Sequence, residues 1–123
     1  MKQCLIVDDS RIMRKIARKI LEEMKFVIDE AEDGAAALDH CRHAMPDAIL
    51  LDCTLPTMSG VDCVTAIRSQ PKLKTVPILM CTAKNKVEDV DRSLNAGAND
   101  YLCKPFEVQQ LRDKISKFLE SPS

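Results

Sequence analysis

Short apolar runs alternate with amphipathic segments along the whole chain, and this alternation restricts the folds that are open to it. The apolar runs predict strands at residues 4–7, 26–31, 48–51, 76–81 and 100–103. Apolar residues spaced three or four apart predict helices at 11–24, 35–43, 61–68, 87–96 and 107–119. Runs without polar alternation are typical of strands buried on both faces of a parallel sheet. The order predicts an α/β fold, a doubly wound five-stranded parallel sheet flanked by five helices.

The composition is that of one folded domain with no strong charge preference. The chain has 123 residues, of which 46% are apolar and 30% charged, and these proportions suit a single hydrophobic core. Lys and Arg total 18 against 19 Asp and Glu, which argues against a polybasic surface for DNA. No apolar run reaches the roughly 20 residues that span a bilayer, and the N-terminus lacks the apolar core of a signal peptide. We expect a cytoplasmic protein that neither binds DNA nor inserts into a membrane.

The histidines and cysteines show no convincing metal site. The cysteines form no CxxC pair, and without an export signal we expect reduced, mostly buried thiols. His40 and His43 lie three residues apart on one predicted helix, but a complete set of zinc ligands is not evident. A redox role for Cys53, Cys81 or Cys103, each next to a candidate site residue, is a minor alternative.

Polar residues stand at the carboxyl ends of four predicted strands. Asp8 and Asp9 follow the first strand, Asp52 the third, Thr82 the fourth and Lys104 the fifth. In open parallel sheets the working site lies beyond the carboxyl ends of the strands. We therefore expect these five residues to meet at one edge of the sheet.

Three carboxylates at one edge need a compensating charge. Two unit charges about 4 Å apart repel by roughly 4 kcal/mol at an effective dielectric constant near 20, so a proton or a hard cation must join them. Oxygen ligands beside a place for phosphate favour Mg²⁺. A carboxylate can also attack phosphorus and hold the group as an acyl phosphate, with a divalent ion, an ammonium and a hydroxyl around it. The edge therefore predicts phosphoryl-transfer chemistry.

Four separated motifs resemble the signature of bacterial two-component response-regulator receiver domains of the CheY-like, single-domain type. They are Val7-Asp8-Asp9-Ser10, the segment 51–60 (LDCTLPTMSG), Thr82-Ala83 and Lys104-Pro105-Phe106. The resemblance runs over essentially the whole chain, with the motifs in order at the predicted strand ends. It implies the strand order 2-1-3-4-5, a receiver domain over residues 1–120 and a short flexible tail at 121–123.

The resemblance also implies a role for each residue at the edge. Asp52 becomes the phospho-acceptor, and Lys104 pairs with the phosphate oxygens and precedes a cis peptide bond to Pro105. The implied cofactor is Mg²⁺ or Mn²⁺, and its implied protein ligands are Asp8, Asp9, Asp52 and the backbone carbonyl of Thr54.

Two further pairs of residues follow from the same resemblance. Thr82 and Tyr101 match the switch pair, in which the hydroxyl moves toward the phosphoryl group and the ring rotates into the vacated space. Position 54 is Thr and position 84 is Lys, where more familiar receivers differ. These two positions border the attacking water in the family, so Thr54 and Lys84 are predicted to tune the lifetime of the phosphoryl group.

The predicted function is that of a stand-alone receiver. It takes a phosphoryl group from a sensor histidine kinase or a histidine phosphotransfer protein. It then signals to an unknown downstream protein through its fourth helix, fifth strand and fifth helix. It catalyses only its own phosphorylation and dephosphorylation, so it is not an enzyme with a separate substrate. The alternatives are a phosphate sink, a phosphorelay intermediate or, from another class, a Mg²⁺-dependent phosphohydrolase.

The first predicted helix carries a basic stripe with two readings. The stripe is either a solvated face or a docking surface for a helical phosphodonor, with Ile12 or Met13 as a partly exposed anchor. Its members are Arg11, Arg14, Lys15, Arg18 and Lys19.

Overall fold

The computed structural model describes residues 2–83 and 87–120 and has the predicted α/β architecture. Its strands are β1 (Gln3–Val7), β2 (Val27–Ala31), β3 (Ala48–Asp52), β4 (Ile78–Ala83) and β5 (Asp100–Lys104). Its helices are α1 (Arg11–Glu23), α2 (Gly34–His43), α3 (Gly60–Arg68), the short 3₁₀ helix η1 (Pro71–Leu73), α4 (Val87–Ala96) and α5 (Val108–Glu120). The strands pair in parallel in the order β2-β1-β3-β4-β5, which confirms the predicted fold class.

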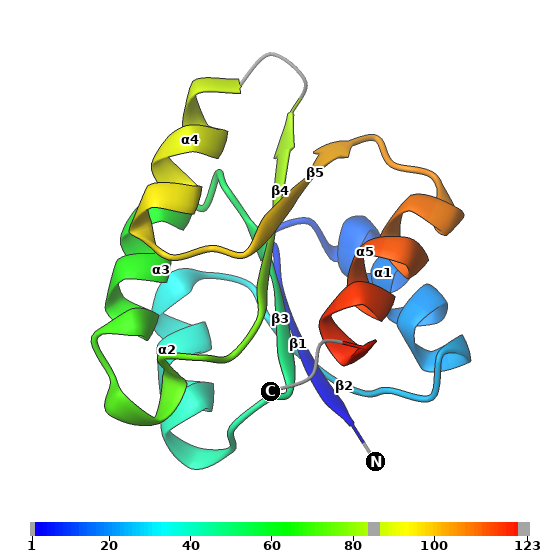
Figure 1. The fold of residues 1–123 in the computed structure, drawn as a ribbon, viewed down its shortest axis with the longest axis horizontal. Helices are drawn as coiled ribbons and strands as arrows, with labels where there is room; N and C mark the ends of the chain where they lie inside the picture. The colour runs from blue at the N-terminus through cyan, green and yellow to red at the C-terminus, as the bar shows by residue number, and fades with distance from the viewer. Residues whose placement is uncertain (1, 84–86, 121–123) are drawn as a thin grey trace.

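The sheet separates two layers of helices. Helices α1 and α5 cover one face, and α2, α3 and α4 cover the other (Figure 1). Side chains alternate between the two faces along the interior strand β1: Leu5 and Val7 pack in the core beneath α2 and α3, whereas Cys4 and Ile6 pack beneath α1 and α5. Both faces are thus buried, which explains why the strands read as continuous apolar runs.

Helix ends follow local signals in the sequence. Ser10 caps α1, since its side-chain oxygen accepts a hydrogen bond from Met13 N at 3.2 Å. Helix α4 ends at Ala96, and the next residue, Gly97, has φ of 124°, a conformation that side chains disfavour. Ser and Gly are the residue types typical of these two positions.

The fourth strand differs most from its prediction. It runs from Ile78 to Ala83, two residues later than the predicted 76–81. Pro77 has no N–H to donate, so the ladder begins after it, although Val76 is buried like a strand residue. As a result Thr82 lies inside β4 rather than beyond its end.

Within the described residues, none of the helices combines the length and apolar character needed to cross a bilayer. The proposed tail at 121–123 lies outside the described residues.

Candidate functional site

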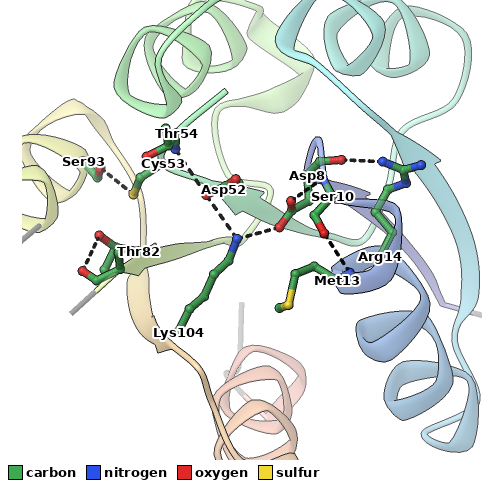
Figure 2. A network of polar contacts seen from close by, with 11 residues as sticks. Asp8, Ser10, Met13, Arg14, Asp52, Cys53, Thr54, Thr82, Ser93 and Lys104 are labelled. Carbon is green, nitrogen blue, oxygen red and sulfur yellow. Dashed lines mark hydrogen bonds and ion pairs between the residues drawn. The ribbon is translucent and has the colours of Figure 1, made fainter. Parts of the chain in front are cut away.

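The predicted site residues come together at the carboxyl edge of the sheet. Asp8 directly follows β1, Asp52 is the last residue of β3, and Lys104 is the last residue of β5. Strand β4 lies between β3 and β5 and brings Thr82 to the same edge. Figure 2 shows Lys104 reaching across this edge toward both aspartates.

Asp8, Asp9 and Asp52 form an acidic cluster. One carboxylate oxygen from each lies within 4.8 Å of the others. Asp8 and Asp52 are buried, at 6% and 7% exposure, whereas Asp9 is exposed. Two carboxylates therefore sit in a medium that screens charge poorly, and the third closes the cluster toward solvent.

Lys104 contributes a positive charge to this cluster. Its Nζ lies 2.7 Å from Asp8 Oδ2 and 3.4 Å from Asp52 Oδ1. Burial opposes the charge on Lys104, but the hydrogen bond to Asp8 and the attraction of Asp52 outweigh it and raise its pKa. Burial also raises the pKa of Asp52, and the attraction of Lys104 only partly offsets this. The single ammonium of Lys104 thus only partly offsets the cost of burying the ionised Asp52 carboxylate.

The loop after Asp52 holds that side chain and leaves little space around it. Thr54 N donates to Asp52 Oδ1 at 3.2 Å, and Gly60 N donates to Cys53 O at 2.9 Å. A Cβ at Gly60 would lie 2.6 Å from Cys53 Cα and 2.7 Å from Asp52 O, so only glycine fits there. Ser59 caps α3 next to this point by accepting from Asp62 N. The sequence Ser-Gly therefore closes the loop tightly beneath Asp52.

The donor set suits a hard divalent cation. The cluster offers only carboxylate oxygens, which Mg²⁺ prefers, and it contains no imidazole or thiolate. The raised pKa of Asp52 points the same way, because a cation would relieve the cost of ionising it. The residues present therefore fit Mg²⁺.

Comparison with known proteins agrees with this geometry. A family model described as "Response regulator receiver domain" matches residues 4–116. The chain belongs to the response regulator receiver family. Receivers of this family are signalling domains.

Individual relatives of this receiver cover nearly its whole length. The chemotaxis protein CheY of Pseudomonas aeruginosa is 38% identical over 117 residues, which are 94% of either chain. A response regulator from Chloroflexus aurantiacus superposes with a TM-score of 0.94 at 34% identity and covers 98% of both chains. The receiver domain of a sensor histidine kinase from Pseudomonas aeruginosa has a TM-score of 0.90 at 31% identity over 98% of both chains, and that structure has a magnesium ion coordinated in its active-site cleft.

The two predicted switch residues, Thr82 and Tyr101, lie in different surroundings. Thr82 is buried, with 1% exposure. Tyr101, on the neighbouring strand β5, is 39% exposed, and the Nζ of Lys114 lies 5.4 Å from the centroid of its ring. The side chain at position 101 thus lies at the surface beside α5.

The peptide bond between Lys104 and Pro105 is cis, as predicted. Lys84 lies outside the described residues.

The thiols and histidines take ordinary structural roles. All six cysteines are free, and five of them are buried, which confirms the prediction of mostly buried thiols. Burial raises the pKa of Cys4 and of Cys63 to about 12, so these thiols stay protonated and unreactive. His40 Nε2 lies 3.4 Å from Asp29 Oδ2, and His43 Nδ1 donates to Asp39 O at 2.9 Å. Neither histidine belongs to the acidic cluster.

The basic stripe on α1 is not uniformly exposed to solvent. The interpretation of the stripe as a solvated face is wrong for Arg14. The side chain of Arg14 is only 13% exposed, and its Nη1 donates to the backbone oxygen of Asp8 at 2.7 Å. Ile12, by contrast, is 71% exposed, as an anchor would be, and Met13 is half-buried. The only sequence feature that relates Arg14 to Asp8 is their separation of six residues across the start of a helix. This separation does not determine which partner a long arginine side chain contacts.

Two further contacts near the site were not anticipated. Asp8 Oδ1 accepts a hydrogen bond from Ser10 N at 2.9 Å, which orients that carboxylate from its own loop. Cys53 Sγ lies 3.9 Å from Ser93 Oγ, so the residue after Asp52 contacts the buried face of α4 (Figure 2). Ser10 and Ser93 belong to no sequence pattern that would predict these two contacts, because the contacts depend on how the chain packs.

Proposed function

We propose that this receiver accepts a phosphoryl group on Asp52 and uses it to switch a binding surface for a downstream protein. The observation that carries the proposal is the convergence of three carboxylates and one lysine ammonium at the carboxyl edge of the sheet. An acceptor carboxylate, ligands for a divalent cation and a cation for the phosphoryl oxygens are the groups that phosphoryl transfer to a carboxylate needs.

The transfer is a displacement at phosphorus. A carboxylate oxygen of Asp52 attacks the phosphorus of a phosphohistidine on a kinase or phosphotransfer protein. A P–O bond forms, the P–N bond breaks, and its electron pair stays on the imidazole, which takes up a proton from solvent. Lys104, already 3.4 Å from Asp52, pairs with an oxygen of the transferred group. Bound Mg²⁺ would offset the negative charge gathered on the carboxylates and the phosphoryl oxygens.

The metal ligands and the lifetime residues complete the site. We assign Asp8, Asp9 and Asp52 as carboxylate ligands of Mg²⁺, with the backbone carbonyl of Thr54 as the remaining protein ligand. The Thr54 side chain is exposed beside Asp52, where a water that hydrolyses the acyl phosphate must approach. Thr54 and Lys84 are the positions assigned to set the lifetime of the phosphoryl group.

The switch runs from Thr82 to the surface of β5. A phosphoryl group on Asp52 is a new cluster of acceptors at the edge where Thr82 lies, and the hydroxyl moves toward it. Tyr101, which is 39% exposed, then turns inward and alters the surface formed by α4, β5 and α5. A downstream protein reads this altered surface.

Delivery of the phosphoryl group uses the neighbouring helix. Ile12 is 71% exposed at the start of α1, close in sequence to Asp9, and Arg11 and Lys15 on the same helix are exposed as well. An apolar anchor within a basic rim suits a helical donor with an acidic surface. Six free thiols suit a reducing compartment, and we place the protein in the cytoplasm.

The decisive experiment is incubation with Mg²⁺ and acetyl phosphate, followed by intact-mass measurement. We expect the wild type to gain one phosphoryl group and Asp52→Asn to gain none. The matched control is Asp91→Asn, which removes an exposed carboxylate on α4 and should be phosphorylated like the wild type. Phosphorylation that persists in Asp52→Asn would refute the assignment of the acceptor.

A second measurement separates the messenger from its alternatives. Pull-downs with and without a phosphoryl mimic should recover a partner that depends on phosphorylation. A phosphate sink has no such partner, whereas a phosphohydrolase turns over a generic phosphoester faster than its own acyl phosphate decays.

A further inference from the structure

Arg14 links the acidic cluster to the neighbouring strand. Its Nη1 donates to Asp8 O at 2.7 Å (Figure 2). Its Nε donates to Glu30 Oε1 at 2.8 Å. The other oxygen of Glu30 accepts from Arg18 Nη1 at 2.6 Å. The Arg14 guanidinium is thus held from both sides, by the backbone carbonyl of Asp8 and by one oxygen of the Glu30 carboxylate.

The carbonyl that Arg14 binds belongs to the peptide unit between Asp8 and Asp9. Because that unit is planar, fixing its oxygen also fixes the N–H of Asp9 and the direction in which the chain enters this residue. Asp8 has further attachments, since its N donates to Ala31 O and its carboxylate accepts from Ser10 N and Lys104 Nζ. Asp9 is exposed, and Arg14 binds the carbonyl group whose carbon is bonded to the nitrogen of Asp9.

We propose that Arg14 is a positioning residue for the metal site. It holds the Asp8–Asp9 peptide so that the Asp9 carboxylate lies with those of Asp8 and Asp52, and Glu30 fixes the guanidinium in turn. This inference rests on the proposed function, because it takes the acidic cluster as the Mg²⁺ site. Partners that orient metal ligands in this way are typically worth tenfold to a hundredfold in metal affinity.

A purely electrostatic role for Arg14 predicts the opposite result. A guanidinium near the cluster repels a cation, so its removal would tighten Mg²⁺ binding if charge alone mattered. If Arg14 positions Asp9, its removal weakens binding. Arg14→Lys sharpens the contrast, because a lysine keeps the charge but cannot bind Asp8 O and Glu30 with one rigid fork.

The test measures Mg²⁺ affinity by calorimetric titration of the purified protein. We expect Arg14→Gln and Arg14→Lys each to weaken binding by about tenfold. Arg18→Gln is the matched control: it removes the same charge from the same helix and the same partner Glu30, but not a contact with Asp8. Its affinity should stay within about twofold of the wild type, since no positioning contact is lost.

A double-mutant cycle tests the role of Glu30. Glu30→Gln should weaken binding in the wild-type background and have no further effect in Arg14→Gln. Equal effects in both backgrounds would mean that Glu30 acts by charge alone, and would overturn its part in the proposal.

A readout without metal separates this inference from the proposed function. In ¹⁵N NMR spectra of the metal-free protein, Arg14→Gln and Arg14→Lys should shift the amide resonance of Asp9, whereas Arg18→Gln should leave it in place. Unchanged or tighter Mg²⁺ binding by Arg14→Lys, or an unmoved Asp9 resonance, would overturn the proposal. A wild type that binds no Mg²⁺ would refute the proposed metal site, and the Asp9 resonance would still decide whether Arg14 orients this peptide.

Discussion

Charged side chains lie partly or fully buried at both the carboxyl edge and the amino edge of the sheet, and their surroundings differ. At the carboxyl edge, Asp8, Asp9 and Asp52 lie within 4.8 Å of one another and Lys104 contacts two of them. At the amino edge, Arg68 closes α3 against the segments before β4 and β5. Its partners are uncharged: Gly97 O at 3.0 Å, Leu73 O at 2.7 Å and Asn99 Oδ1 at 2.9 Å.

The difference teaches what each end is built for. Among the described residues, the hydrogen bonds of Arg68 go to carbonyl and amide oxygens, which stabilise its charge without a ligand. Burial nevertheless lowers the pKa of Arg68. The carboxyl edge keeps like charges together, and burial raises the pKa of Asp52. One end is complete as folded, and we expect the other to become more stable when a cation binds.

Added Mg²⁺ should produce the largest effect on stability. At about 100 times its dissociation constant, a ligand that binds only the folded state adds about 2.7 kcal/mol to the free energy of unfolding. Urea unfolding in Mg²⁺ and in EDTA measures this gain. Asp9→Asn should lose most of it, and Asp91→Asn should keep it. A wild type equally stable in both buffers would remove the contrast between the two ends.

Removal of Arg68 should have the next largest effect, with the opposite sign. Arg68→Ala leaves Gly97 O and Leu73 O without this donor, and we expect a loss of about 2 kcal/mol in the free energy of unfolding. Arg92→Ala is the control, since that side chain is 66% exposed and its ion pairs are 3.9 Å long. Mg²⁺ should add as much stability to Arg68→Ala as to the wild type. Coupling between the two changes would mean that the ends are not independent.

The smallest effect should come from neutralising Asp52 in the absence of metal. Because the folded protein raises the pKa of Asp52, ionisation costs stability: the stability present below the ordinary carboxyl pKa, near 3.9, is lost as the pH rises through the folded value. Asp52→Asn should therefore melt above the wild type in EDTA at about pH 7 and lose this advantage near pH 3. Thermal melts across this range measure it, and a variant less stable than the wild type at neutral pH would contradict the raised pKa.

Several elements could be predicted because their signals are local or topological. The caps at Ser10 and Gly97 depend on residue types with a direct backbone role. The convergence of Asp8, Asp52 and Lys104 needs only their positions at strand ends, since parallel strands share one carboxyl edge. The predicted start of β4 was wrong by two residues. The prediction followed the apolar run from Val76 and did not take into account that Pro77 lacks an N–H to donate.

The sequence by itself determined the layered α/β fold and the edge at which the acids meet, because apolar periodicity and strand ends are properties of the chain's own order. Only the tertiary structure decided which partners the long side chains choose. Lys104 lies closer to Asp8 than to Asp52, and Arg14 turns from the solvated stripe to Asp8 O. Such choices depend on packing between residues as far apart as 8 and 104, where rotamer freedom and burial, rather than spacing, set the contact.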